Sequence, residues 1–116
     1  MKFSIIVAIV AEELEEKAIE SAKQAGAGGV TILNAKGMGL KEKKIFGGLA
    51  TLERKESILL FIVPTNFSFH LLKEMNKDLD LDGNGHGIVF SLPLEHLKGI
   101  PLEQINMFEE KLQPLI

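Results

Sequence analysis

Two glycine clusters are the parts of this sequence whose residue types and spacing could do chemistry. One runs from Lys36 to Gly39 and the other from Gly83 to Gly87. Glycine permits positive φ and lets backbone N–H groups approach a ligand closely, which is how phosphates are held without side chains. Neither cluster has the glycine spacing of the dinucleotide fingerprint or the Gly-Lys-Ser/Thr of a P-loop. The clusters therefore predict an anion cradle, with ordinary turns as the alternative.

The segment that follows the first cluster is locally cationic. It carries six of the 13 basic residues within twenty positions: Lys36, Lys41, Lys43, Lys44, Arg54 and Lys55. Only Glu42 and Glu53 oppose them there. A solvated surface segment explains any single lysine. A basic segment beside a glycine cluster is more specific and favours an anionic ligand.

The composition excludes several classes of chemistry. The chain has 116 residues, no cysteine and a formal net charge of -3, which excludes thiolate metal sites and disulfides and favours a reducing cytoplasm. The absence of Trp and Tyr, together with the negative charge, argues against nucleic-acid binding. The sequence has no recognisable nucleophile–base pair or pair of buried carboxylates, so we expect no enzymatic activity.

Hydropathy patterns predict four strands and three helices. Continuous apolar runs with β-branched residues favour strands, and apolar residues three or four apart favour helices. The expected elements are a strand at 5–10, a helix at 12–26, a strand at 30–33, a strand at 58–63, a helix from about 65 to 79, a strand at 88–90 and a helix at 101–113. The interval 36–56 holds four glycines and many charges, and we expect a long loop there.

The order of these elements predicts an α+β fold of the ferredoxin-like type, βαββαβ, with a long loop between the second and third strands and a C-terminal helix. We expect residues 1–98 to form the ferredoxin-like domain and residues 99–116 to form a C-terminal helical extension of the same domain. Two helices cover one face of such a sheet, and these apolar strands would leave the other face open. Self-association is the simplest way to cover that face.

A short acidic stretch offers a metal-binding alternative. Asp78 to Gly83 reproduces the first six positions of a calcium-binding EF-hand loop, but Val89 stands where the bidentate glutamate is needed. A strand pattern follows instead of a second helix, so an acidic turn is favoured. His86 and His96 are isolated and lack the spacing of a metal site.

Five motifs occur in a fixed order along residues 1–98. They are Gly29-Val30-Thr31-Ile32, Lys36-Gly37-Met38-Gly39, Ile45-Phe46-Gly47-Gly48, Val63-Pro64, and Gly85-His86-Gly87 leading through Phe90 to Pro93. As an ordered set they resemble the nitrogen-regulatory PII signalling proteins, of which this chain would be a divergent, PII-like member. The resemblance implies a homotrimer with no obligatory cofactor that binds adenine nucleotides (ATP, ADP or AMP) between subunits. It also implies that the long loop changes shape on binding and docks onto a target protein.

The resemblance further implies which residues bind ligand and partner. The family's nucleotide-contacting threonine, its glycines and its adenine-pocket backbone fall here at Thr31, Gly37, Gly39, Val63, Pro64, Gly85 and Gly87, and Lys41 stands where a glutamine helps bind 2-oxoglutarate. Within the loop 40–56, the implied partner-binding residues are Lys43, Lys44, Phe46 and Arg54. If the glycines hold phosphates, replacing Gly87 by valine should weaken binding more than it destabilises the fold.

The chain departs from the family pattern where phosphates would be bound. Ile88 replaces the family's phosphate-binding lysine, the downstream arginine pair is missing near Lys98, and no tyrosine is present for uridylylation. Each lost cation removes a charge-assisted hydrogen bond worth about 1.5–3 kcal/mol. We therefore expect weak discrimination between ATP and shorter nucleotides unless the loop lysines compensate, and 2-oxoglutarate sensing does not follow from the resemblance.

Taken with the resemblance, the sequence predicts a cytoplasmic, non-catalytic PII-like regulator that binds a small anionic effector and acts on a target protein through its loop. The resemblance suggests nitrogen metabolism as the setting and a membrane transporter as the kind of target. The alternative is a structural or metal-binding ferredoxin-like trimer that does not respond to nucleotides.

Overall fold

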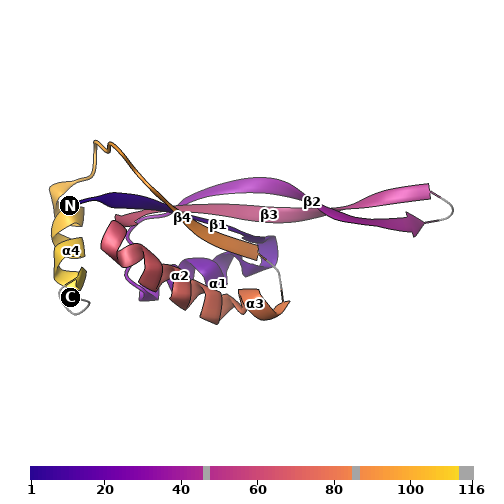
Figure 1. The fold of residues 1–116 in the computed structure, drawn as a ribbon, viewed down its shortest axis with the longest axis horizontal. Coiled ribbons are helices and arrows are strands. Elements are labelled where there is room, and N and C mark those ends of the chain that lie inside the picture. The colour runs from indigo at the N-terminus through magenta and orange to yellow at the C-terminus, as the bar shows by residue number, and fades with distance from the viewer. Residues whose placement is uncertain (46–47, 85–86, 113–116) are drawn as a thin grey trace.

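The computed structural model describes residues 1–45, 48–84 and 87–112, and it describes side chains in these ranges except at 39–52 and 84. The elements are β1 (Phe3–Ala11), η1 (Glu12–Leu14), α1 (Glu15–Gln24), β2 (Thr31–Ile45), β3 (Gly48–Pro64), α2 (Thr65–Leu79), α3 (Leu81–Asn84), β4 (Gly87–Pro93) and α4 (Leu102–Leu112). The strands form a sheet in the order β2-β3-β1-β4, with neighbours antiparallel. The predicted α+β, ferredoxin-like fold with a C-terminal helix is confirmed (Figure 1).

Strand β1 lies inside the sheet, between β3 and β4, and both of its faces are partly or fully covered. Ile6, Ala8 and Val10 face the helices and are at most 1% exposed. The alternate residues point to the opposite face because successive side chains of a strand point to opposite sides. Both sets are mainly apolar, which is why the sequence shows a continuous apolar run here.

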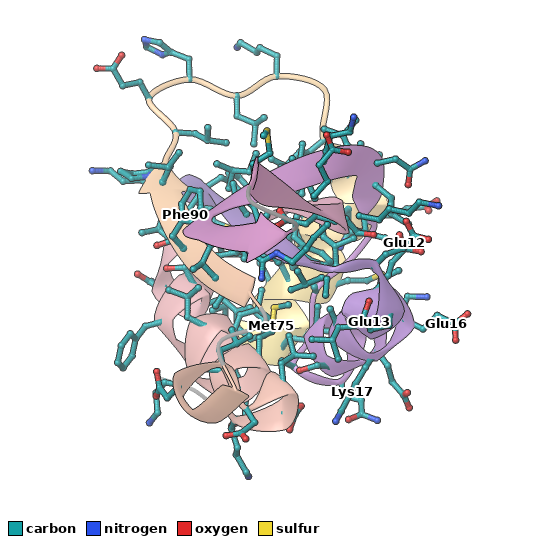
Figure 2. All side chains as sticks on the ribbon, turned by 90° about the vertical axis from the view of Figure 1, so that its right-hand side faces the viewer. Glu12, Glu13, Glu16, Lys17, Met75 and Phe90 are labelled. Atoms are coloured by element: carbon teal, nitrogen blue, oxygen red, sulfur yellow. The ribbon has the colours of Figure 1, made fainter. Side chains whose placement is uncertain are left out.

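Helices α1 and α2 pack on one face of the sheet and enclose the core (Figure 1). Leu59, Leu71 and Met75 are 0% exposed, and Phe61 is 1% exposed. Figure 2 shows Met75 in the layer between the sheet and the helices. Burying each such side chain contributes about 1.5–3 kcal/mol, so this layer supplies most of the stability of the subunit.

The opposite face of the sheet is apolar and is not covered by a helix in the described ranges. We call this the open face. The strand register places on it Leu33, Ile58, Leu60, Ile62, Ile5, Val7, Ile9, Ile88, Phe90 and Leu92. Several of these side chains are strongly exposed, including Ile88 at 58% and Leu92 at 51%. A contiguous apolar face of this kind marks an interaction surface.

Strands β2 and β3 continue far beyond the rest of the sheet as a two-stranded hairpin (Figure 1). Strand β1 ends opposite Glu56, whereas the β2–β3 pairing continues to the pair Ile45 and Gly48. The interval predicted as a loop is therefore mostly paired strand, with 46–47 outside the described residues. A ribbon that projects beyond the sheet and its helices needs no apolar alternation, so the glycines and charges of this interval have the pattern of a loop.

The hairpin makes the molecule long. The principal extents of the molecule are 59 × 28 × 21 Å and its radius of gyration is 16.6 Å. A compact domain of this length has a radius of gyration of about 13 Å. An irregularity also interrupts the hairpin near its base, because β2 advances four residues between Met38 and Glu42 while β3 advances two. Gly39 therefore lies in a bulge rather than in a turn.

Helix α4 packs at the end of the molecule away from the hairpin (Figure 1). Phe108 is 2% exposed, and its ring centroid lies 6.3 Å from that of Phe3. Lys111 Nζ donates to the carbonyl oxygen of Gly26 over 3.4 Å, and Leu112 joins the main core. The helix is therefore docked onto the body of the subunit. None of the helices in the described part of the chain is long and apolar enough to cross a membrane.

Candidate functional site

A hollow of about 720 Å³ lies where β1 ends, β4 begins and the hairpin leaves the sheet. Its apolar wall is formed by Ile9, Ala11 and Ile88, beside the backbone of Gly87. Its charged wall is formed by Glu12, Glu13, Arg54, Lys55 and Glu56. Small-molecule sites are typically hollows of about 300–1,000 Å³ that combine apolar walls with a few polar groups. This hollow has the size and the mixed lining of such a site.

The strand register and one buried hydrogen bond position the walls of the hollow. Ile9 is paired with Ile88, and Ala11 is paired with Glu56. Ser57 is 0% exposed, and its hydroxyl donates to the Glu15 carboxylate over 2.7 Å. This bond ties the start of α1 to β3, so the preceding η1 turn stays beside the base of the hairpin. Figure 2 shows the molecule from the hairpin end. Glu12 and Glu16 lie on the α1 side, at the right of the view, and Phe90 of β4 lies at the left.

The charged wall brings cations and carboxylates together. It contains two cations and three carboxylates. Arg54 Nη2 lies 3.8 Å from Glu56 Oε1, with the Arg54 side chain 55% exposed and that of Glu56 18% exposed. A partly exposed ion pair of this kind contributes about 0–1 kcal/mol. The hollow therefore offers a guanidinium to an anion and offers carboxylates to hydroxyl or amino groups.

Gly37 borders the charged wall. It pairs with Arg54 across the hairpin, and a Cβ at this position would overlap the Glu56 carboxylate. The missing side chain lets the Glu56 carboxylate lie against the β2 backbone. The group that approaches Gly37 in this structure is a side chain of the same subunit. The approach of a ligand phosphate to this glycine stays a prediction.

Position 87 must be glycine for a structural reason that the sequence prediction missed. A Cβ here would lie 2.7 Å from the Ile9 carbonyl oxygen and 2.9 Å from Val10 Cγ1. Strand β4 would have to move away from β1 to accept any side chain. Replacing Gly87 by valine would therefore also destabilise the fold, because the pairing of these two strands needs the glycine. The larger effect on ligand binding stays a prediction.

The structure does not bring the predicted ligand-binding residues together within one chain. Val63 and Pro64 are buried at one end of β3, whereas Gly37 is paired with Arg54, nine residues back along that strand. Nine strand residues span about 30 Å. Thr31, which is paired with Leu60, lies between these levels on the opposite edge of the sheet from β4. Of the predicted residues described with side chains, Gly87 and Arg54 line the hollow and Gly37 adjoins it.

Other predicted residues cannot be placed at the side-chain level. The backbone of Gly39, Lys41, Lys43 and Lys44 belongs to β2, and the side chains of the three lysines lie outside the described part. Gly85 and Phe46 lie outside the described residues altogether.

The sequence prediction missed the carboxylates of the hollow. Arg54 and Glu56 are alternate residues of one strand and therefore share a face, so their spacing could have indicated the pair. Glu12 and Glu13 come from the end of β1, far away in sequence. Their place in the hollow follows from the pairing of β1 with β3, which no local pattern in the sequence specifies.

In the described residues, the acidic stretch 78–83 makes hydrogen bonds within the subunit. The Asp78 carboxylate accepts a hydrogen bond from Ser21 Oγ over 2.7 Å, and the Asp82 carboxylate accepts one from Asn76 Nδ2 over 2.8 Å. These oxygens fasten the end of α2 to its neighbours. Among the residues that the structure describes, no group of three or more histidine, aspartate or glutamate side chains could hold a metal ion.

Several solved structures have a fold similar to that of this chain. Among solved structures, the chain is similar to GlnK of B. subtilis in its complex with ATP, with a TM-score of 0.65 and 13% identity over 81% of this chain and 85% of that chain. The periplasmic divalent cation tolerance protein CutA from Archaeoglobus fulgidus matches with a TM-score of 0.63 and 15% identity, over 97% of this chain and 100% of that chain. CPII, a nitrogen regulatory PII-like protein from Thiomonas intermedia K12 bound to ADP, AMP and bicarbonate, matches with a TM-score of 0.57 and 20% identity, over 86% and 98% of the two chains.

At these identities the structural likeness concerns the fold. The search among curated proteins gave no match. The family model of nitrogen regulatory protein P-II matches residues 3–103, which is most of the chain and includes all four strands with both helices that cover the sheet. The chain belongs to the nitrogen regulatory protein P-II family.

Proposed function

We propose that this chain is a trimeric regulator that binds an adenine nucleotide at the base of the hairpin and acts on a partner protein through the hairpin. The observation that carries the proposal is the hollow beside Arg54, at the point where a four-stranded sheet becomes a projecting ribbon. Membership of the P-II family supports it. GlnK has been solved with ATP, and CPII with ADP and AMP, which supports adenine nucleotides as the effectors.

The lining of the hollow suits the parts of a nucleotide. The Arg54 guanidinium is a planar fork of donors that matches a phosphate group. The apolar wall at Ile9 and Ile88 offers a surface to an adenine ring. The Glu12 carboxylate can accept hydrogen bonds from ribose hydroxyls or from the adenine amino group.

The number of cations that line the hollow limits how many phosphate groups of a nucleotide the site can bind. Ile88 lines the hollow, is 58% exposed and has no donor with which to hold a phosphate. Each phosphate beyond the first therefore meets fewer fixed cations than the family pattern provides. We infer that AMP and ADP compete well with ATP. Further phosphate contacts would come from Lys55, which lines the hollow, and from Lys41, Lys43 and Lys44.

The open face supports a homotrimer as the assembled form. Away from the hollow, its exposed apolar side chains, such as Phe90 and Leu92, need a cover, and copies of the same face are the simplest one. Ile9 and Ile88, at the edge of this face, stay available to the ligand. Assembly would also bring the separated ligand residues together, because opposite sheet edges of two neighbouring subunits can meet. The proposed ligand-binding set is Thr31, Gly37, Gly39, Lys41, Val63, Pro64, Gly85 and Gly87, drawn from adjacent subunits.

The hairpin is the proposed partner-binding element. An isolated two-stranded ribbon is marginally stable in water, so its arrangement is open to change by a ligand bound at its base. Lys43, Lys44 and Phe46 would face the partner. Arg54, which the resemblance implied as a fourth partner-binding residue, lines the hollow and is assigned to the ligand instead. We propose a regulatory role without catalysis, in the cytoplasm, with nitrogen metabolism as the setting and a membrane transporter as the kind of target.

A thermal-shift panel on the full chain tests the proposal. AMP, ADP and ATP are each expected to raise the unfolding temperature, because a ligand at one hundred times its Kd adds about 2.7 kcal/mol to the native state. Parallel samples with 2-oxoglutarate, bicarbonate and calcium show which other effectors bind. If none of the adenine nucleotides shifts the unfolding temperature, the nucleotide proposal is wrong.

A structural or metal-binding trimer is the second candidate. The fold likeness to the divalent cation tolerance protein CutA extends over 97% of this chain and all of that one, which favours it. Stabilisation by divalent cations, with no response to nucleotides, would support this candidate over the first.

A further inference from the structure

Glu56 holds a particular position at the base of the hairpin. Its carboxylate lies against the Gly37 backbone, in the space that a Cβ would occupy. The two residues are diagonal neighbours across the β2–β3 pair, because Gly37 is opposite Arg54 and Ala35 is opposite Glu56. Diagonal neighbours on one face are within reach of long side chains. The glycine therefore creates a place for an anion, and Glu56 fills it.

The Glu56 carboxylate forms only a long ion pair with Arg54. The distance between Glu56 Oε1 and Arg54 Nη2 is 3.8 Å, whereas a charge-assisted hydrogen bond measures about 2.7–2.9 Å. Arg54 also lines the hollow and is 55% exposed. A ligand in the hollow can therefore reach the guanidinium without first breaking a tight bond.

A carboxylate and a phosphate compete for the same partners. Both accept hydrogen bonds from an arginine fork, and both can approach backbone closely at a glycine. A phosphate carries more charge and more acceptor oxygens than a carboxylate. A ligand phosphate would therefore displace the Glu56 carboxylate, which is only loosely paired with Arg54.

We propose that Glu56 is an internal anion that occupies the phosphate position between Gly37 and Arg54 in the unliganded protein, and that a phosphate group of the ligand displaces it. This inference rests on the proposed function, since it assigns the anionic part of the ligand to this hollow. It makes Glu56 a specificity-determining residue, because an anion must compete better than a carboxylate in order to bind.

The displacement acts where the hairpin meets the sheet. Glu56 pairs with Ala11 on β1 and with Ala35 on β2. It is the last residue of β3, moving toward the hairpin tip, that has a strand on both sides. Moving its side chain therefore changes the junction between the rigid sheet and the ribbon, which couples ligand binding to the hairpin.

Calorimetric titration with inorganic pyrophosphate, and separately with ADP, tests the inference on the full chain. The proteins are the wild type, Glu56→Gln and Glu13→Gln. The Glu13 variant is the matched control, since it removes the same charge from the lining of the same hollow. Pyrophosphate should bind Glu56→Gln at least about tenfold more tightly than the wild type, and Glu13→Gln less than about threefold more tightly. Equal gains in the two variants, or weaker binding by Glu56→Gln, would overturn the inference.

The two ligands separate this inference from the proposed function. Tighter pyrophosphate binding by Glu56→Gln, with no response of any protein to ADP, would uphold the inference and remove the nucleotide. If ADP binds all three proteins with the same Kd, the nucleotide proposal is upheld and the displacement of Glu56 is overturned. Failure of all three to bind pyrophosphate would overturn the inference. The Gly37 amide resonance of the wild type gives a readout that depends on no variant, because pyrophosphate should shift it, and binding without that shift contradicts the displacement.

Discussion

Truncating Phe90 to alanine should loosen the proposed trimer while leaving the subunit folded. Phe90 lies on the open face of β4, opposite Val7 of β1, and is 36% exposed. If neighbouring subunits cover this face, the exposed part of the ring leaves water on assembly. The alanine variant gives up that part of the driving force in every subunit.

The exposed fraction sets the size of the effect. A phenylalanine side chain presents about 200 Å², so a ring that is 36% exposed leaves about 70 Å² for the interface. At about 25 cal/mol per Å² this is about 1.8 kcal/mol per subunit and about 5 kcal/mol for three subunits. The trimer dissociation constant then rises by about 10⁴, and the concentration of half-dissociation, which scales as its square root, rises by about 100-fold.

Sedimentation velocity over a dilution series from micromolar to nanomolar concentration measures this shift. Phe69→Ala is the matched control, because Phe69 is an exposed phenylalanine on α2, away from the open face, with 71% exposure. The wild type and Phe69→Ala should dissociate at the same concentration, and Phe90→Ala at a concentration about 100-fold higher. Identical dissociation of the two variants, or a wild type that is monomeric at micromolar concentration, would refute the reasoning.

Three further outcomes are expected. Gly87→Ala should destabilise the fold by about 1–3 kcal/mol in urea titrations, because its Cβ would meet the Ile9 carbonyl at 2.7 Å. Gly29→Ala is the control, because a Cβ at this position would have no atom within 4 Å, and its unfolding free energy should stay close to that of the wild type. Equal urea midpoints for the two variants would show that β4 has room for a side chain at Gly87. Arg54→Gln should weaken ADP binding by about ten- to a hundredfold in calorimetry, through the loss of one charge-assisted hydrogen bond; an unchanged affinity removes Arg54 from the site. Phe108→Ala should cost about 3–5 kcal/mol and speed amide exchange over 102–112, whereas a cost below about 1 kcal/mol would contradict the docking of α4.

The core of the fold could be predicted because its signals are local. The apolar run of β1 and the apolar spacing of α2 specify each element from its own residues, and the order of the elements then leaves few topologies. The hairpin could not be predicted in this way. Beyond Glu56 its strands pair only with each other, so what holds them is backbone pairing, which needs no apolar alternation in the sequence.

The candidate site was predictable only in part, for the same reason. Arg54 and the glycines stand out by residue type, and Gly37 does lie where another group approaches its backbone closely. What approaches it is the Glu56 carboxylate, and the rest of the hollow comes from the end of β1. Those contacts depend on the register between strands that are more than forty residues apart, and residue type alone does not encode that register.

The most direct test of the central claim is to follow the backbone amide resonances of the full chain during titration with ADP. Binding at the base of the hairpin predicts that the largest shifts cluster at 9, 11–13, 54–56 and 87–88, the residues that line the hollow. Saturating shifts confined to other elements, such as α2 or α4, or no shift at any ADP concentration, would contradict the claim that this hollow is the nucleotide site.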